Sequence, residues 1–335
     1  MHLDGAADAN VAVRVVVEEN SSSRSVAARF AQSGALVSDV CPIVGQIYRK
    51  VVIRLVVCSY LEDIQETSSV KGSKMNRIFA YGDKVLLIDS KKRRYLTTLV
   101  EQGEFHSHSG FVAHDLVIGQ TEGVVIPTTK GALFSVLRPT LEDFVLEMPR
   151  GAQVIYPKDL APICMIADIG PDTHVFESGI GSGALSMTML RYGASITGYE
   201  IREDFANRAK SNVRSFLGAH ALDRYAIEIR DAYEGIDGTD FDRVVLDLPE
   251  PWTVVPHASR ALRRGGLLVA YTPSITQAVQ VRQAMGSEWI ESRTLEVLHR
   301  TWHIEGMAVR PDHRMVAHTA FLTVGRYIGT ASAPL

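Results

Sequence analysis

The sequence predicts an α/β protein with a doubly wound, mostly parallel sheet that is preceded by a small all-β domain. Two observations support this prediction. From about residue 149 onward, apolar strand-like runs alternate with helix-forming segments, which is typical of a parallel sheet with helices on both faces. Residues 75–148 are instead strand-like and interrupted by glycines, as in a small β-barrel or sandwich.

Composition indicates a soluble two-domain chain of 335 residues, 46% of them apolar. The net charge of −3 does not by itself indicate a nucleic-acid binder, so any RNA contact needs local basic patches. Cys41, Cys58 and Cys164 are odd in number and lack C-x-x-C spacing. They favour neither disulfides nor zinc and fit a reducing cytoplasm. We expect no membrane span and no signal sequence.

Residues 1–74 differ from the remainder, with valine runs, a serine patch and no sustained period. They end in a polar stretch, Ser68 to Lys74, directly before Met75. We interpret Met75 as the true start, and the preceding residues as a disordered or gene-model extension. The alternative is an additional domain.

Residues 75–148 are expected to form an RNA-binding or oligomerisation domain. A strand, a turn at Gly82-Asp83 and a second strand lead to the basic run Lys91–Arg94 at a hairpin tip. This run is either a solvated turn or a phosphate-contacting patch. His106 and His108 form an H-x-H pair without further ligands, so we predict no metal site. Arg138 to Arg150 reads as a short helix between domains, opening at Pro139 and stopping before Pro149.

The second domain, residues 149–329, is predicted element by element from its apolar periods. After a helical segment that ends at Ile169, the expected elements are a strand at Val175-Phe176, a helix at 184–190, a strand at Ser195–Tyr199, a helix at Glu203–Leu217, strands at Ala226–Arg230 and Arg243–Leu248, a helix at Pro256–Arg263, a strand at Leu267–Tyr271, a helix at Ile275–Met285, and strand-like segments at Thr294–Trp302 and His318–Arg326.

A glycine turn joins the first strand of this domain to its helix, in the pattern Glu177-x-Gly179-x-Gly181-x-Gly183. Glycines allow backbone N–H groups and the helix N-terminus to approach a ligand closely. Glu200 follows the next strand, where it can accept hydrogen bonds from ribose hydroxyls. The stretch therefore predicts a nucleotide-like cofactor. The alternating glycines differ from the G-x-G-x-x-G of dinucleotide binders and argue against an NAD-dependent dehydrogenase.

Three acids lie at strand ends: Glu200, Asp231 and Asp247. In an open α/β sheet these ends line one crevice. Glu200 suits ribose, and Asp231 with Ala232 suits an adenine amino group, which leaves Asp247 for substrate. The motif Asp247-Leu-Pro-Glu-Pro-Trp252 projects a carboxylate and an aromatic ring from a backbone held by two prolines, which suits a flat base.

Taken together, these motifs resemble the tRNA (adenine-N1)-methyltransferase family, which modifies adenosine 58 of the T-loop. The motifs that carry the resemblance are Phe105–Gly110, His114-Asp115, Ile118-Gly119, Met148–Asp159, Glu177–Leu185, Asp247–Trp252, Tyr271–Gln277, Arg310-Pro311 and His318–Phe321. The match covers about residues 76–327 and spans both domains in order. It departs at Ser109, where the family usually has a basic residue, and at Ala317, where it has glycine.

The resemblance implies a Rossmann-like class I methyltransferase domain, S-adenosylmethionine (AdoMet) as methyl donor, tRNA as partner and a homotetramer. The candidate catalytic residues are Asp247, Tyr156 and Tyr271. The candidate cofactor-binding residues are Glu177, Ser178, Gly179, Ile180, Gly181, Gly183, Ala184, Glu200, Phe205, Asp231, Ala232 and Asp247. The alternatives are a non-catalytic tRNA-binding subunit, or a class I methyltransferase that acts on another substrate.

Overall fold

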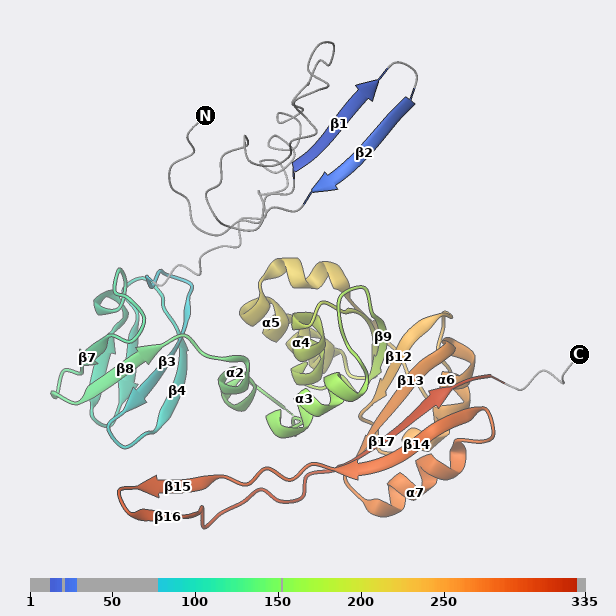
Figure 1. The fold of residues 1–335 in the computed structure, drawn as a ribbon. Helices are drawn as coiled ribbons and strands as arrows, with labels where there is room; N and C mark the ends of the chain where they lie inside the picture. The colour runs from blue at the N-terminus through green and yellow to red at the C-terminus, as the bar shows by residue number, and fades with distance from the viewer. Residues whose placement is uncertain (1–12, 20–21, 29–77, 152, 330–335) are drawn as a thin grey trace, which may run out of the picture. The chain divides into compact units, whose positions relative to one another are not determined.

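The computed structural model describes residues 13–19, 22–28, 78–151 and 153–329 (Figure 1). The chain divides into two compact units, residues 1–76 and 77–335. In the first unit, β1 (Val13–Glu19) pairs antiparallel with β2 (Ser22–Ala28). The rest of the expected N-terminal extension lies outside the described residues.

The all-β part of the second unit consists of two antiparallel sheets. Its strands are β3 (Lys84–Asp89), β4 (Arg94–Thr98), β5 (Glu104–Ser107), β6 (Gly110–Ala113), β7 (Val125–Pro127) and β8 (Leu133–Leu137). The larger sheet has the order β4-β3-β8-β7, and β5 pairs with β6. Phe79, Leu87 and Phe134 are buried in a separate core beneath them. Ile78 forms an isolated bridge with Thr121, and the described residues 78–81 do not form the strand expected before Gly82.

Helix α2 (Leu141–Glu147) follows this domain, as predicted. Thr140 and Asp143 form a capping box at its start, which satisfies two backbone N–H groups. Asp143 also forms an ion pair with Arg94 of β4. The predicted linker helix is thus attached to the β domain by a side chain as well as by the chain itself.

The α/β domain is built on one seven-stranded sheet (Figure 1). Its strands are β9 (His174–Ser178), β10 (Ser195–Glu200), β11 (Tyr225–Ile229), β12 (Phe241–Leu246), β13 (Leu262–Thr272), β14 (Trp289–Glu296) and β17 (Phe321–Tyr327), in the order β11-β10-β9-β12-β13-β17-β14. All neighbouring pairs are parallel except those of β17, which is antiparallel to β13 and β14. The strand order reverses between β9 and β12.

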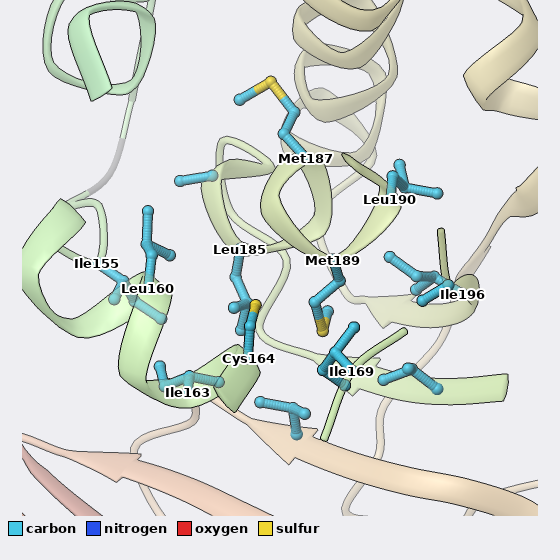
Figure 2. Packing of buried hydrophobic residues seen from close by; sticks show 14 of the residues in the cluster. Ile155, Leu160, Ile163, Cys164, Ile169, Leu185, Met187, Met189, Leu190 and Ile196 are labelled. Atoms are coloured by element: carbon cyan, nitrogen blue, oxygen red, sulfur yellow. The ribbon is translucent and has the colours of Figure 1, made fainter. Parts of the chain in front are cut away.

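Helices cover both faces of this sheet. They are α3 (Pro157–Ile166), α4 (Ala184–Arg191), α5 (Glu203–Leu217), α6 (Val255–Ala261) and α7 (Ile275–Ala284). Val175 of β9 packs in one core with α3, α4 and α5, and its neighbour Phe176 packs in a second core with α6 and α7. Figure 2 shows Leu185 of α4 and Cys164 of α3 meeting in the first core. The predicted doubly wound sheet is confirmed.

Some element boundaries differ from the sequence prediction. The last two strand-like segments are β14 and β17, and β14 ends at Glu296. Between them lies a hairpin that the sequence analysis missed, formed by β15 (Trp302–Glu305) and β16 (Ala308–Pro311). We call this hairpin the arm. It stands apart from the large sheet (Figure 1). Its strands therefore lack the alternation of buried and exposed side chains that is typical of a strand packed on a core.

Candidate functional site

The glycine loop begins where β9 meets the reversal point of the sheet. Gly179 has φ of +87°, and a Cβ atom there would lie 1.9 Å from the carbonyl oxygen of Asp247. No side chain can occupy that space, so glycine is required both by conformation and by contact. The backbone after β9 and the backbone after β12 are therefore in direct contact.

The remaining glycines shape the start of α4. Gly183 is the N-cap residue at φ +81°, and a Cβ there would meet Ala209 of α5 at 3.1 Å. Gly181 has φ of +54° with open space beside it. Its N–H donates to Oε2 of Glu200 at 3.1 Å, and the N–H of Arg202 donates to Oε1 at 3.0 Å. Glu200 thus lies next to the loop, as predicted.

Glu177 lies beneath the loop and is 2% exposed. Its Oε2 accepts a hydrogen bond from Ser186 at 2.7 Å, and the Ser186 hydroxyl accepts one from Tyr225 at 2.8 Å. Burial raises the pKa of Glu177 to about 8, with smaller contributions from the Asp247 and Glu200 carboxylates. The side chain therefore contacts α4 and β11 inside the protein.

Asp247 follows β12 directly and is partly buried. Burial raises the pKa of its carboxyl group to about 7, and no described residue donates a hydrogen bond to the group. The loop that carries it is held from two sides. Nε2 of Gln277 donates to the Pro249 carbonyl at 2.9 Å, and the N–H of Glu250 donates to the Tyr233 hydroxyl at 3.0 Å.

Tyr156 and Tyr271 lie on two further elements around this carboxylate. Tyr156 is the N-cap residue of α3, and Tyr271 lies near the end of β13. The pKa of Tyr271 is raised, first by burial and then by the charges of Asp159 and Asp247, with a smaller contribution from Tyr156. The structure thus brings the three candidate catalytic residues to the same edge of the sheet.

The remaining predicted cofactor residues surround the same edge. Ser178 and Ile180 are buried next to Gly179, Ala184 opens α4, and Ala232 is 2% exposed after β11. Asp231 accepts a hydrogen bond from the N–H of Tyr233 at 2.9 Å. Phe205 lies in the first turn of α5, with the Arg202 guanidinium 3.8 Å from its ring centroid.

Two residues that the sequence analysis did not select also shape the glycine loop, one within it and one from α5. Ser182 is 3% exposed, and its hydroxyl has no hydrogen-bond partner among the described residues. Asn212 of α5 donates to the carbonyls of Ser182 at 3.0 Å and Pro149 at 3.1 Å, which ties the interdomain linker to the loop. The position of Ser182 between two selected glycines was the available signal. No signal in the sequence marked Asn212, because its role depends on a tertiary contact.

The other motifs of the β domain have local partners. Arg93 pairs with Asp89 at 2.6 Å, His106 with Glu104 at 3.1 Å, and His108 contacts Arg93 at 2.6 Å. Across the described ranges, no cluster of three or more His, Cys, Asp or Glu side chains could hold a metal ion. In the same ranges, no helix combines the length and the apolar character that a membrane crossing requires.

A cavity of about 510 Å³ lies next to α2, α3 and α4. Its walls include Leu141, Val145, Leu160, Arg191 and His299. None of the predicted site residues lines it.

The residues at the strand ends fit AdoMet. The cofactor needs acceptors for its ribose hydroxyls and its cationic groups, and donors for its carboxylate. Glu200 supplies an acceptor at the end of β10, and the space beside Gly181 leaves room for a close backbone approach. The unpaired hydroxyl of Ser182 supplies a further polar group in the loop.

Comparison with known proteins identifies the chain. The family profile described as tRNA methyltransferase complex GCD14 subunit matches residues 132–319, and the profile TrmI-like N-terminal matches residues 78–126. The tRNA (adenine(58)-N(1))-methyltransferase TrmI of Thermus thermophilus is 36% identical over 251 residues, 74% of this chain and 98% of the relative. The tRNA (adenine(57)-N(1)/adenine(58)-N(1))-methyltransferase TrmI of Methanocaldococcus jannaschii is 34% identical over 278 residues, 74% of this chain and 95% of the relative.

Solved structures agree. A SAM-dependent O-methyltransferase from Thermotoga maritima superposes with a TM-score of 0.73 at 30% identity, covering 78% of this chain and 98% of the other. The tRNA (m1A58) methyltransferase TrmI from Aquifex aeolicus superposes with a TM-score of 0.67 at 28% identity, covering 76% of this chain and all of the other. Fold and site define a class I AdoMet-dependent methyltransferase. Within that class, the chain belongs to the TrmI/GCD14 family of tRNA methyltransferases.

Replacing Glu200 with Ala is expected to weaken AdoMet binding by roughly ten- to a hundredfold, because the carboxylate would lose charge-assisted hydrogen bonds to the ribose. Isothermal titration calorimetry would measure the affinity. Glu203→Ala, an exposed acid in the first turn of α5, is the control. Unchanged affinity in Glu200→Ala would contradict the assignment.

Proposed function

We propose that this chain transfers the methyl group of AdoMet to N1 of adenosine 58 in the T-loop of tRNA. Relatives that carry this activity in their names match it over both domains, one of them at 36% identity. The single observation that carries the proposal is the contact of the glycine loop with the backbone of Asp247. This contact supports the proposal that a methyl-donor site lies beside an acceptor site for a flat base.

Methyl transfer to adenine N1 requires that the base be positioned and that the positive charge on its ring be stabilised. Adenine N1 has its own lone pair, so attack on the methyl group depends mainly on in-line orientation. The ring becomes cationic as the bond forms. The carboxylate of Asp247 has no other hydrogen-bond donor among the described residues, so it is available to accept from the exocyclic N6 and to stabilise that charge.

The base must leave its stack to reach this carboxylate, because N1 lies on the pairing edge. Tyr156 and Tyr271 support the proposal as the walls of the pocket, since the pKa of Tyr271 on β13 responds both to the charge of Asp247 and to Tyr156 at the start of α3. AdoMet, when bound, supplies the methyl group. The glycine loop and the Asp247 loop are both fully formed, as an active subunit needs and a degenerate, non-catalytic one does not.

Asp247→Ala is expected to abolish most methyl transfer and to leave AdoMet affinity largely unchanged, because the carboxylate acts on the substrate base. The protein would be incubated with labelled AdoMet and unmodified tRNA, and the methylated nucleoside would be mapped. Calorimetry would measure cofactor affinity in parallel. Label in protein but not in tRNA would refute the proposed function. Lost affinity with normal turnover per bound cofactor would refute the role of Asp247.

The rate is also expected to depend on pH in a defined direction. Because the pKa of Asp247 is raised to about 7, its carboxyl group is neutral below that pH and cannot stabilise a cationic ring. We expect kcat/KM to fall about tenfold per pH unit below pH 7 and to level off above it. Asp247→Asn should remove this dependence from the residual rate. A profile that kept its midpoint in Asp247→Asn would assign the titration to another group.

We also propose that the chain assembles as a homotetramer, as the family resemblance implies, and that it acts in the reducing cytoplasm, which its cysteine pattern fits. The arm supports self-association. Trp302 pairs with Pro311 and Ile304 with Val309, so strand alternation places these four side chains on one face. Ile304 is 72% exposed and Val309 59% exposed. A two-stranded hairpin with an uncovered apolar face is marginally stable alone, so a second copy that covers it would stabilise it.

Replacing Ile304 and Val309 together with Glu is expected to lower the molar mass measured by light scattering at fixed protein concentration, because charges would then face the interface. His303→Glu, on the opposite face of the arm, is the control. An unchanged molar mass in the double variant would show that the arm is not part of the interface between subunits.

A further inference from the structure

One peptide group in the loop after β12 is held at both of its hydrogen-bonding atoms. It joins Pro249 to Glu250, just beyond Asp247. Its carbonyl oxygen accepts from Nε2 of Gln277 at 2.9 Å, and its N–H donates to the Tyr233 hydroxyl at 3.0 Å. Gln277 belongs to α7 and Tyr233 to the segment after β11, so two separate parts of the fold contact one peptide plane.

The prolines of this loop do not fix that plane by themselves. A proline ring restricts its own φ angle and removes its own N–H group. The plane between Pro249 and Glu250 turns about ψ of Pro249 and φ of Glu250, and neither of these angles is closed in a ring. Since both flanking prolines lack an N–H group, Glu250 carries the backbone donor of this turn. The two side chains therefore supply the restraint that the prolines do not.

The orientation of the Gln277 amide is determined by its partner. A carbonyl oxygen only accepts, so the group that faces Pro249 is the NH₂ group. Within the part of the chain that the structure describes, Oε1 of this amide is buried and has no partner. Gln277 lies in the first turn of α7, which is capped by the side chain of Ser274. The amide is thus carried on a fixed helix end and contacts the loop through its nitrogen.

The backbone of Tyr233 is held on both sides. Its N–H donates to Asp231 at 2.9 Å, and its carbonyl accepts from Nε2 of His257 at 3.1 Å. Arg260 only donates and contacts Nδ1 of the same ring, so a neutral His257 carries its proton on Nε2. The Tyr233 ring packs against the core formed with α6 and α7. Its hydroxyl therefore accepts the Glu250 N–H from a fixed place.

The backbone of Asp247 is fixed from β9. Its N–H donates to the Ser178 carbonyl at 2.9 Å, and its own carbonyl oxygen lies against Gly179. A side chain keeps its direction only when the chain on both sides of it is held. The strand holds the chain before Asp247, and the Pro249–Glu250 peptide is the next held point after it.

We propose that Tyr233 and Gln277 are positioning residues, which hold the Pro249–Glu250 peptide and thereby aim the Asp247 carboxylate at the substrate base. This inference rests on the proposed function, in which that carboxylate accepts from the exocyclic amino group. Both side chains act through Asp247 and contact neither the base nor AdoMet. Catalysis depends strongly on such placement, because a displaced group meets the transition state poorly.

The test begins with two substitutions that each remove one of the hydrogen bonds. Tyr233→Phe removes the hydroxyl and keeps the ring. Gln277→Glu keeps the shape and removes the NH₂ group that donates to Pro249. We expect each to lower kcat at saturating AdoMet and tRNA by about tenfold, the worth of about one hydrogen bond. AdoMet affinity by calorimetry and KM for tRNA should change by less than about twofold.

Thr253→Val is the matched control in the same loop. The Thr253 hydroxyl donates to the Glu250 carbonyl at 2.8 Å, and the Thr253 N–H donates to the same oxygen at 3.1 Å. The variant removes a side-chain hydrogen bond of the loop and leaves the carbonyl with a partner. Its kcat should stay within about twofold of that of the unaltered protein.

Double variants separate positioning from the stability of the fold. Because both side chains hold one peptide group, Tyr233→Phe with Gln277→Glu should lose about as much as the larger single loss, and less than the product of the two. Because both act through Asp247, either substitution should change the residual rate of Asp247→Asn by less than about twofold. That residual rate is measured in single turnover with labelled AdoMet.

Several outcomes would overturn the proposal. A loss of about tenfold that persists in Asp247→Asn, or a matching loss of AdoMet affinity, would show that the side chains serve only the fold. Unchanged kcat in both single variants would refute the positioning role, and a double loss equal to the product would refute the shared peptide group. If the unaltered protein leaves adenosine 58 unmethylated, the proposed function itself fails. That result is distinct from normal methylation with silent variants.

Discussion

The contact between the Gly179 backbone and the carbonyl oxygen of Asp247 is the constraint on which the site depends. It joins the loops after β9 and β12, the two neighbouring parallel strands between which the strand order reverses. Open α/β sheets bind ligands at such a reversal. Because a Cβ would lie 1.9 Å from that oxygen, only glycine allows this approach. The separation between the glycine loop and the Asp247 loop is thus set by backbone atoms.

The electrostatics of the site oppose the stability of the apoprotein. Glu177 and Asp247 have folded-state pKa values raised to about 8 and about 7, mainly by burial. A carboxyl group whose pKa is higher in the folded state than in the unfolded chain lowers the free energy of unfolding as the pH rises from the unfolded-state pKa to the folded-state pKa. Between about pH 4 and pH 8 these two groups therefore favour unfolding increasingly. The same charges suit a sulfonium cofactor and a base that becomes cationic, so the cost is connected to function.

The sequence predicted the fold well where burial imposes a period. Helix α5 has the predicted bounds, Glu203–Leu217, because its apolar residues recur at helical spacing. The arm escaped prediction because its apolar face is exposed among the described residues. Strand β13 starts at Leu262 through an irregular pairing with β12 that no local pattern encodes. The glycines and the acids at strand ends could be predicted from the sequence, since the topology of a parallel sheet alone brings the ends of its strands together. Gln277 and Pro249 are 28 residues apart, so their hydrogen bond could come only from the folded chain.

The side-chain amide of Asn212 connects the interdomain linker to the glycine loop. One amide group holds the carbonyl of Pro149, in the segment that leads from the β domain, and the carbonyl of Ser182, inside the glycine loop. The two carbonyls share one donor group, so a shift of the Asn212 side chain would remove the hydrogen bond of the linker and that of the glycine loop together. The path of the linker is therefore tied to the shape of the glycine loop by one side chain of α5.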